Sequence, residues 1–70
     1  MPIFLAPLNT EVTITHIHGE GKVVKHLKDL GLTAGAKVRV LANDKGALIL
    51  FVLGSKLAID KDSARAILVS

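Results

Sequence analysis

Cysteine, tryptophan and tyrosine are absent from this chain of 70 residues, and phenylalanine occurs twice. Without cysteine there is no disulfide, no thiolate zinc site and no thiol nucleophile. Half of the residues are nonetheless hydrophobic, and most of these are aliphatic. A chain of this length makes one small domain at most and buries only about 60% of the surface that its unfolded form exposes. We therefore expect a single domain over residues 1–70, built on an aliphatic core.

A strong charge of either sign is also lacking. Nine Lys and Arg residues stand against six Asp and Glu, which gives a net charge of +3. The lysines are scattered singly, and no aromatic residues are interleaved with them. Proteins that bind nucleic acid usually gather basic charge on one face, often with aromatic residues for stacking. We expect no nucleic-acid partner, and we interpret the lysines as solvated residues that keep the domain soluble.

Long hydrophobic runs and catalytic motifs are missing as well. The longest apolar run, Ala47 to Leu53, is far shorter than the roughly 20 residues of a membrane helix. Residues 1–8 lack the basic start of a signal peptide. The stretch "GEGK" at Gly19 lacks the first glycine and the Ser or Thr of a phosphate-binding loop, and no serine has a nucleophile context. We expect a soluble cytoplasmic protein that is not an enzyme.

Residues 11–18 alternate between apolar and polar side chains, which is typical of a strand with one buried face. The apolar spacing then changes from two residues to three between Ile14 and Ile17. One extra residue in a strand is what a β-bulge supplies. A bulge within Thr15–His16 would return Ile17 to the core and leave the neighbouring histidines facing outward.

The two histidines of "THIHG", His16 and His18, are the candidate metal ligands. Histidine is the commonest metal ligand among side chains, and residues two apart in a strand point to the same face. A stable zinc site needs three or four converging ligands, and nothing in the sequence places His26 close enough to complete the pair. We expect surface histidines and no cofactor, with adventitious binding of a transition metal as the alternative.

A helical period follows in "GKVVKHLKDLG", residues 21–31, where apolar residues recur at i, i+4 and i+7. Gly31 is placed to end this helix in the left-handed conformation. Leu27 and Leu32 are then the pair expected to touch across a Schellman cap. In the next segment, Gly35 fits the third position of a type II turn.

The other segments predict an extended arm before the first strand and a series of short strands after the helix. Several short strands with close turns predict a small closed barrel that is mainly β, with one amphipathic helix and a helical turn. The segments are an arm at 1–8, a strand at 36–42, a hairpin turn at 43–46, a strand at 47–53, a turn at 54–56, a strand at 57–59, a helical turn at 60–66 with Asp60 as N-cap, and a last strand at 67–69.

Partner contact is the remaining class of function. The strand from Ala47 to Leu53 is apolar on both faces, so one face lines the barrel while the other lies under the helix or stays free. A contiguous exposed apolar patch would mark an interface. The residues predicted for partner contact are Leu27, Leu30, Leu32, Ile49 and Phe51.

The segment "HLKDLGLTAGAKVRVL", residues 26–41, resembles the helix, the LGL-x-x-G turn and the V-x-V strand of the FeoA family, small cytosolic proteins of bacterial ferrous iron uptake. The likeness continues through "ALILFVLGSKLAIDKDSARAILV", residues 47–69, and spans the chain from about Leu8 to Val69. Two departures are visible. Ala34 stands where the family commonly has proline, and "LNTEV" stands where it often has a Pro-Gly pair before the first strand.

This resemblance implies an SH3-like β-barrel without catalytic activity, and a partner in the membrane iron permease FeoB, which carries a cytosolic GTP-binding domain. The membrane is then approached only through the permease. The same fold occurs by similarity as the C-terminal domain of DtxR-type repressors, but this chain has no DNA-binding domain. We predict an accessory or regulatory protein of ferrous iron uptake that binds FeoB. The alternative is a metal sensor or carrier using His16 and His18, and a homo-oligomer is left open.

Overall fold

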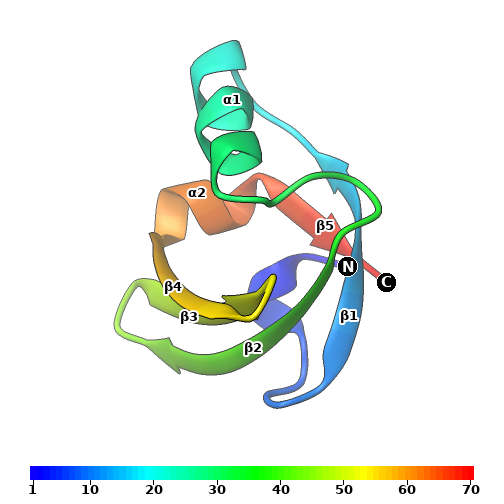
Figure 1. Ribbon diagram of the computed structural model, residues 1–70. Coiled ribbons are helices and arrows are strands. Elements are labelled where there is room, and N and C mark those ends of the chain that lie inside the picture. The colour runs from blue at the N-terminus through cyan, green and yellow to red at the C-terminus, as the bar shows by residue number, and fades with distance from the viewer.

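The structure, a computed structural model, describes all residues from 1 to 70. Its strands are short and two of its three helices have at most five residues (Figure 1). The elements in chain order are η1 (Ile3–Leu5), β1 (Glu11–Ile17), α1 (Gly21–Asp29), β2 (Lys37–Asp44), β3 (Ala47–Val52), β4 (Ser55–Asp60), α2 (Lys61–Arg65) and β5 (Ile67–Val69). None of the helices combines the length and the apolar character that spanning a membrane requires.

The strands form one antiparallel sheet in the order β4-β3-β2-β1-β5. Figure 1 shows the sheet curled around the interior, with α1 and α2 above it. The two edge strands do not pair with each other, because α2 connects β4 to β5. The mainly β, SH3-like architecture predicted from the sequence is confirmed, and the barrel closes through the curl of the sheet and through α2.

The core is entirely hydrophobic. Sixteen of the 70 residues are buried, and none of them is polar or charged. Every element contributes to this cluster, and Ile14, Leu50 and Ile67 are among its fully buried members. This matches the aliphatic core expected from the composition.

The N-terminal segment differs from the extended arm that we predicted. Residues Ile3–Leu5 form the 3₁₀ helix η1, and the Ile3 side chain is fully buried. Pro2 forms a β-bridge with Leu68, and the Met1 amino group donates to the Val69 carbonyl oxygen at 3.0 Å. Pro2 and Pro7 suit such an irregular segment, since proline is disfavoured in a central strand. The burial of Ile3 then offsets the entropy that is lost when this segment is ordered.

The bulge predicted in the first strand is present. Ile14 pairs with Val69 and His16 pairs with Leu68, so the register between β1 and β5 shifts at Thr15. Ile17 therefore returns to the core, where it packs half-buried against the cluster. The bulge also turns His16 outward.

The helix α1 ends in the predicted cap. Gly31 has a φ of +89°, the left-handed conformation that a side chain disfavours. The N–H of Leu32 donates to the Leu27 carbonyl at 2.9 Å, and the N–H of Gly31 donates to the Lys28 carbonyl at 2.9 Å. These two bonds define a Schellman motif. Leu27 and Leu32 are both fully buried in the core cluster.

The type II turn is also confirmed, since Gly35 has a φ of +92° and the Ala36 N–H donates to the Thr33 carbonyl at 3.0 Å. Lys45 and Gly46, with φ values of 38° and 92°, form the turn between β2 and β3. This is the two-residue geometry that suits a β-hairpin. The sequence did not reveal a second bulge in this hairpin, at Leu41 between β2 and β3.

The turn predicted over residues 54–56 lies elsewhere. The turn residues are Leu53 and Gly54, with φ values of 52° and 79°. Ser55 and Lys56 already belong to β4 and pair with β3. Leucine rarely adopts a positive φ, so Gly54 alone marked the turn and placed it one residue late.

Replacing Gly31 by alanine will destabilise the fold. The positive φ penalises any side chain, and a Cβ here would lie 2.9 Å from the Leu53 Cδ1. We expect Gly31→Ala to lower the free energy of unfolding by about 1–2 kcal/mol, measured by urea denaturation. Gly21→Ala is the matched control, because its Cβ meets nothing within 4 Å. It should stabilise the fold by roughly 0.5–1 kcal/mol. Equal effects of the two substitutions would contradict the cap.

The N-cap of α2 predicts how stability changes with pH. The Asp60 Oδ1 accepts from the Ser63 N–H at 2.9 Å, which confirms the predicted cap. Hydrogen bonding from Ser63, by its side chain and its backbone N–H, holds the pKa of Asp60 below its ordinary value. The stabilisation is therefore complete above the unfolded-state pKa, about 3.9. It disappears as the pH falls through the lower pKa of the folded state.

We expect Asp60→Asn to keep the cap and to reduce the loss of stability at acid pH. The measurement is the urea midpoint at pH values from 7 down to 2. Asp44→Asn removes an exposed carboxylate of the same sheet that caps no helix, so it serves as the control. If the urea midpoints of the wild-type protein and Asp60→Asn fall in parallel with pH, protonation of the Asp60 carboxylate does not weaken the cap.

Candidate partner-binding surfaces

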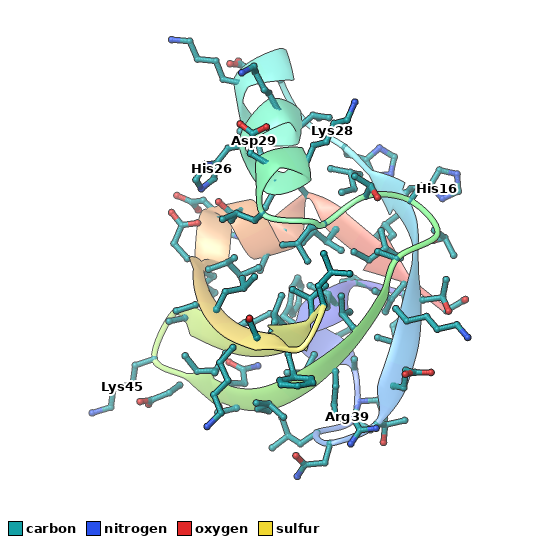
Figure 2. All side chains as sticks on the ribbon, in the orientation of Figure 1. His16, His26, Lys28, Asp29, Arg39 and Lys45 are labelled. Atoms are coloured by element: carbon teal, nitrogen blue, oxygen red, sulfur yellow. The ribbon has the colours of Figure 1, made fainter.

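The two candidate metal ligands lie side by side on the surface. The rings of His16 and His18 stack with centroids 5.9 Å apart and an interplanar angle of 7°. Both residues are exposed, as predicted. His26 does not join them, since Figure 2 shows it on the opposite side of α1 from His16. No three His, Asp or Glu side chains converge anywhere in the structure, so the pair offers a metal ion two protein ligands.

The five residues predicted for partner contact fall into two groups. Leu27 and Leu32 are fully buried, so neither presents an exposed side chain to a partner, which corrects that part of the prediction. The physical reason is the Schellman cap, which turns both leucines into the core. Leu30 is half-buried against the same cluster. Ile49 is half-buried on β3, and Phe51 keeps 39% of its surface exposed.

A groove of about 390 Å³ runs between α1 and the turn that follows it. Half-buried Val24 of α1 and Ile17 of β1 line it, with buried Leu32 at its floor. Ala34 and Thr33 form one wall, and Lys28 is the charged residue of the lining. The groove therefore combines aliphatic walls with a cationic rim.

The surroundings of this groove are also basic. The exposed side of α1 carries three lysines and one histidine, and its one acidic residue is Asp29. Asp29 forms an exposed ion pair with Lys25 at 3.9 Å. Lys28 has no such partner and extends from α1 next to the groove (Figure 2).

The outer side of β3 is the second apolar surface. Leu48, Leu50 and Val52 point into the core, so Ala47, Ile49 and Phe51 point outward. In Figure 1 this side of the sheet faces away from α1 and α2. Neither helix covers it. The second apolar face of the strand therefore does not lie under the helix, which was one of the two arrangements that the sequence allowed.

Leu53, beyond the end of β3, is 85% exposed. Its side chain lies next to Gly31 at the end of α1. It also helps to line a depression of about 230 Å³ together with Phe51, Arg39 and Glu11. Sequence reasoning missed the roles of Leu53 and of Ala34. Val24 falls outside the i, i+4, i+7 spacing of the apolar residues on the helix. This was the one sign in the sequence that α1 has a second apolar side, which lines the groove.

Comparison with known proteins gives a consistent result. The family model described as the FeoA domain matches residues 1–70. The chain is 29% identical over 68 residues to a protein of Methanocaldococcus jannaschii named as an Fe(2+) transport protein A, covering 97% of this chain and 83% of that protein.

Solved structures agree with the family match. A crystal structure of an iron uptake regulatory protein, FeoA, is similar with a TM-score of 0.89 at 28% identity, covering 99% of this chain and 93% of that one. The FeoA protein of Chlorobium tepidum is similar with a TM-score of 0.87 at 27% identity, covering 99% and 68%.

The same fold occurs as part of larger proteins. The T. acidophilum IdeR structure is similar with a TM-score of 0.90 at 22% identity, and the match covers all of this chain but 33% of that one. That likeness concerns the fold alone. The family match is different, since it covers every residue from 1 to 70, and on that ground this protein belongs to the FeoA family.

Proposed function

We propose that this protein is a non-enzymatic accessory protein of ferrous iron uptake, which acts by binding the cytosolic part of a FeoB-type iron permease. The observation that carries the proposal is the match of the FeoA family model to the whole chain. Names of similar proteins that refer to Fe(2+) transport and to iron uptake regulation support it. The protein works in the cytoplasm and reaches the membrane through the permease.

The groove beside α1 is the docking site in this proposal. Its walls are aliphatic, and its rim carries the Lys28 cation, which forms no ion pair. Such a site fits a partner segment that presents an aliphatic side chain to the groove and an acidic residue to Lys28. Helix α1 adds further cations around the site. The partner surface on the permease is accordingly acidic and aliphatic.

The shape of the groove gives binding a defined geometry. Leu32 and Val24 come from the two sides of the Schellman cap, so the rigid end of α1 fixes the width of the groove. Ala34 occupies the second position of the type II turn and is exposed. A small residue at this point keeps the groove open.

We expect Lys28→Glu and Ala34→Glu to weaken binding to the purified cytosolic domain of the permease about tenfold each. The first substitution reverses the charge on the rim, and the second inserts a charged side chain into the groove. Titration calorimetry at 150 mM salt measures the effect. Lys45→Glu is the matched control, since Lys45 lies far from Lys28 in Figure 2 and belongs to the β2–β3 turn.

Two results would count against this proposal in different ways. If the wild-type protein does not bind the permease domain, and deleting it leaves ferrous iron uptake unchanged, the function is wrong. If binding occurs but both groove variants bind like Lys45→Glu, the partner uses another surface.

The stacked pair of His16 and His18 keeps a metal sensor or carrier as the second candidate function. Two parallel imidazoles 5.9 Å apart can supply two of the ligands that a transition metal takes. Micromolar binding of Fe²⁺ or Zn²⁺ that is abolished by His16→Ala and by His18→Ala would favour this function. An absence of binding, or weak binding of Ni²⁺ alone, would exclude it.

A further inference from the structure

The outer side of β3 carries a charge pattern that nothing in the proposed docking to the permease uses. Directly opposite residues in antiparallel strands lie on the same face of the sheet. The strand register therefore places a neighbour on β2 and another on β4 beside each outward residue of β3. Three rows of side chains result: a basic row of Arg39, Phe51 and Lys56; a middle row of Ala42, Ile49 and Ala58; and an acidic row of Asp44, Ala47 and Asp60.

We call these three rows the outer β3 face. All four of its charged residues are exposed, and no ion pair joins them within the chain. The two ends thus carry opposite charge, separated by the aliphatic middle row. Because β3 rises about 3.4 Å per residue, Phe51 and Ala47 are about 14 Å apart.

From this pattern we infer that the outer β3 face binds the same face of a second copy of this chain. A two-fold axis that runs along the middle row, parallel to the sheet, reverses the strand direction between the copies. The basic row of each copy then lies over the acidic row of the other. A two-fold axis along the strands would place like charges together instead, so the charges select one arrangement.

The sizes of the side chains favour the same arrangement. With the axis along the middle row, Ile49 meets its own equivalent at the centre. Phe51, whose surface is 39% exposed, falls over Ala47 of the second copy, the small member of the acidic row. Large side chains thereby oppose small ones across the sheets, which pack about 10 Å apart face to face.

The charges that flank the two rows are of mixed sign. Lys37 lies at the basic end of β2 beyond Arg39, whereas Glu11 is opposite Arg39 on β1 without forming an ion pair. At the acidic end, Lys45 extends away from the body of the molecule in Figure 2. The Asp60 carboxylate caps α2, where its Oδ1 accepts from the Ser63 N–H, so its charge is turned toward that helix. The opposite-charge contact between the copies is therefore the one between Arg39 and Asp44.

The area sets the strength of the association. A stable interface buries at least about 600 Å² on each side, which is roughly one seventh of the 4366 Å² that the chain exposes. Nine side chains on three strands provide less than that, so the dimer is weak. Its formation depends on protein concentration and on salt, because rim charges supply much of its specificity.

Sedimentation equilibrium of the full chain tests the inference, from 20 µM to 2 mM protein and at 50 and 500 mM NaCl. We expect a monomer–dimer equilibrium that weakens at high salt. Arg39→Asp should lower the association constant about tenfold or more, because two carboxylates then face each other at both symmetry-related contacts. Asp44→Arg should do the same through paired cations. Circular dichroism confirms that each variant is folded.

Mixing the two variants gives the decisive result. Arg39→Asp and Asp44→Arg each repel themselves, but in the proposed arrangement they complement one another at both contacts. An equimolar mixture should therefore regain dimers, and so should the double variant Arg39→Asp/Asp44→Arg. Ile49→Lys, at the centre, should abolish association in every combination. Lys28→Glu, on the α1 groove, should leave it unchanged.

Four outcomes overturn the inference, and the first three concern the association itself. The protein is monomeric at 2 mM and low salt; or it dimerises with no effect of Arg39→Asp, Asp44→Arg or Ile49→Lys; or the mixture fails to regain dimers although each variant is folded. If these variants lose binding to the permease domain instead, the face is occupied by that partner and the self-association is wrong. The groove variants of the proposed function are separate, so the two proposals fail independently.

Discussion

Burial of aliphatic side chains in a single cluster is the constraint on which the rest of the structure depends. No disulfide exists, and the two ion pairs, Lys25–Asp29 and Asp62–Arg65, are both exposed. Exposed ion pairs contribute little to stability. A domain of this size therefore relies on the aliphatic residues that it gathers in one core. The bulge at Thr15, the cap at Gly31 and the 3₁₀ turn around Ile3 each serve that end, since each brings an aliphatic side chain into the cluster.

The features that the sequence predicted well are those with a local physical cause. The phase break from Ile14 to Ile17 predicted the first bulge, and Gly31 predicted the end of α1. Asp60 predicted the start of α2. The bulge at Leu41 was missed because apolar residues occur on both sides of that position. Apolar and polar residues do not alternate there, so the extra residue caused no visible change in the pattern. The burial of Ile3 was missed because it depends on β5, at the other end of the chain.

The candidate surfaces were harder to predict for the same reason. Leu27, Leu32 and Phe51 are all apolar, and periodicity alone does not tell which of them stays exposed. The helix cap buries the two leucines, while the sheet leaves Phe51 without a covering helix. The charge rows of the outer β3 face depend on strand register. Arg39 and Lys56, or Asp44 and Asp60, are far apart in sequence and become neighbours only when β3 pairs with both β2 and β4.

The pairing of β1 with β5 has a kinetic consequence. The strands β2, β3 and β4 are joined by two-residue turns, so they form local hairpins at a small entropic cost. The pair His16 and Leu68 joins residues from opposite ends of the chain, and closing such a long loop is slow. We expect the β2–β4 hairpins to form first and the β1–β5 pairing to form last. The backbone of both stacked histidines is held by that end of the chain, since His16 pairs with Leu68 and the His18 N–H donates to the Ala66 carbonyl. Their positions therefore become fixed only as the fold is completed.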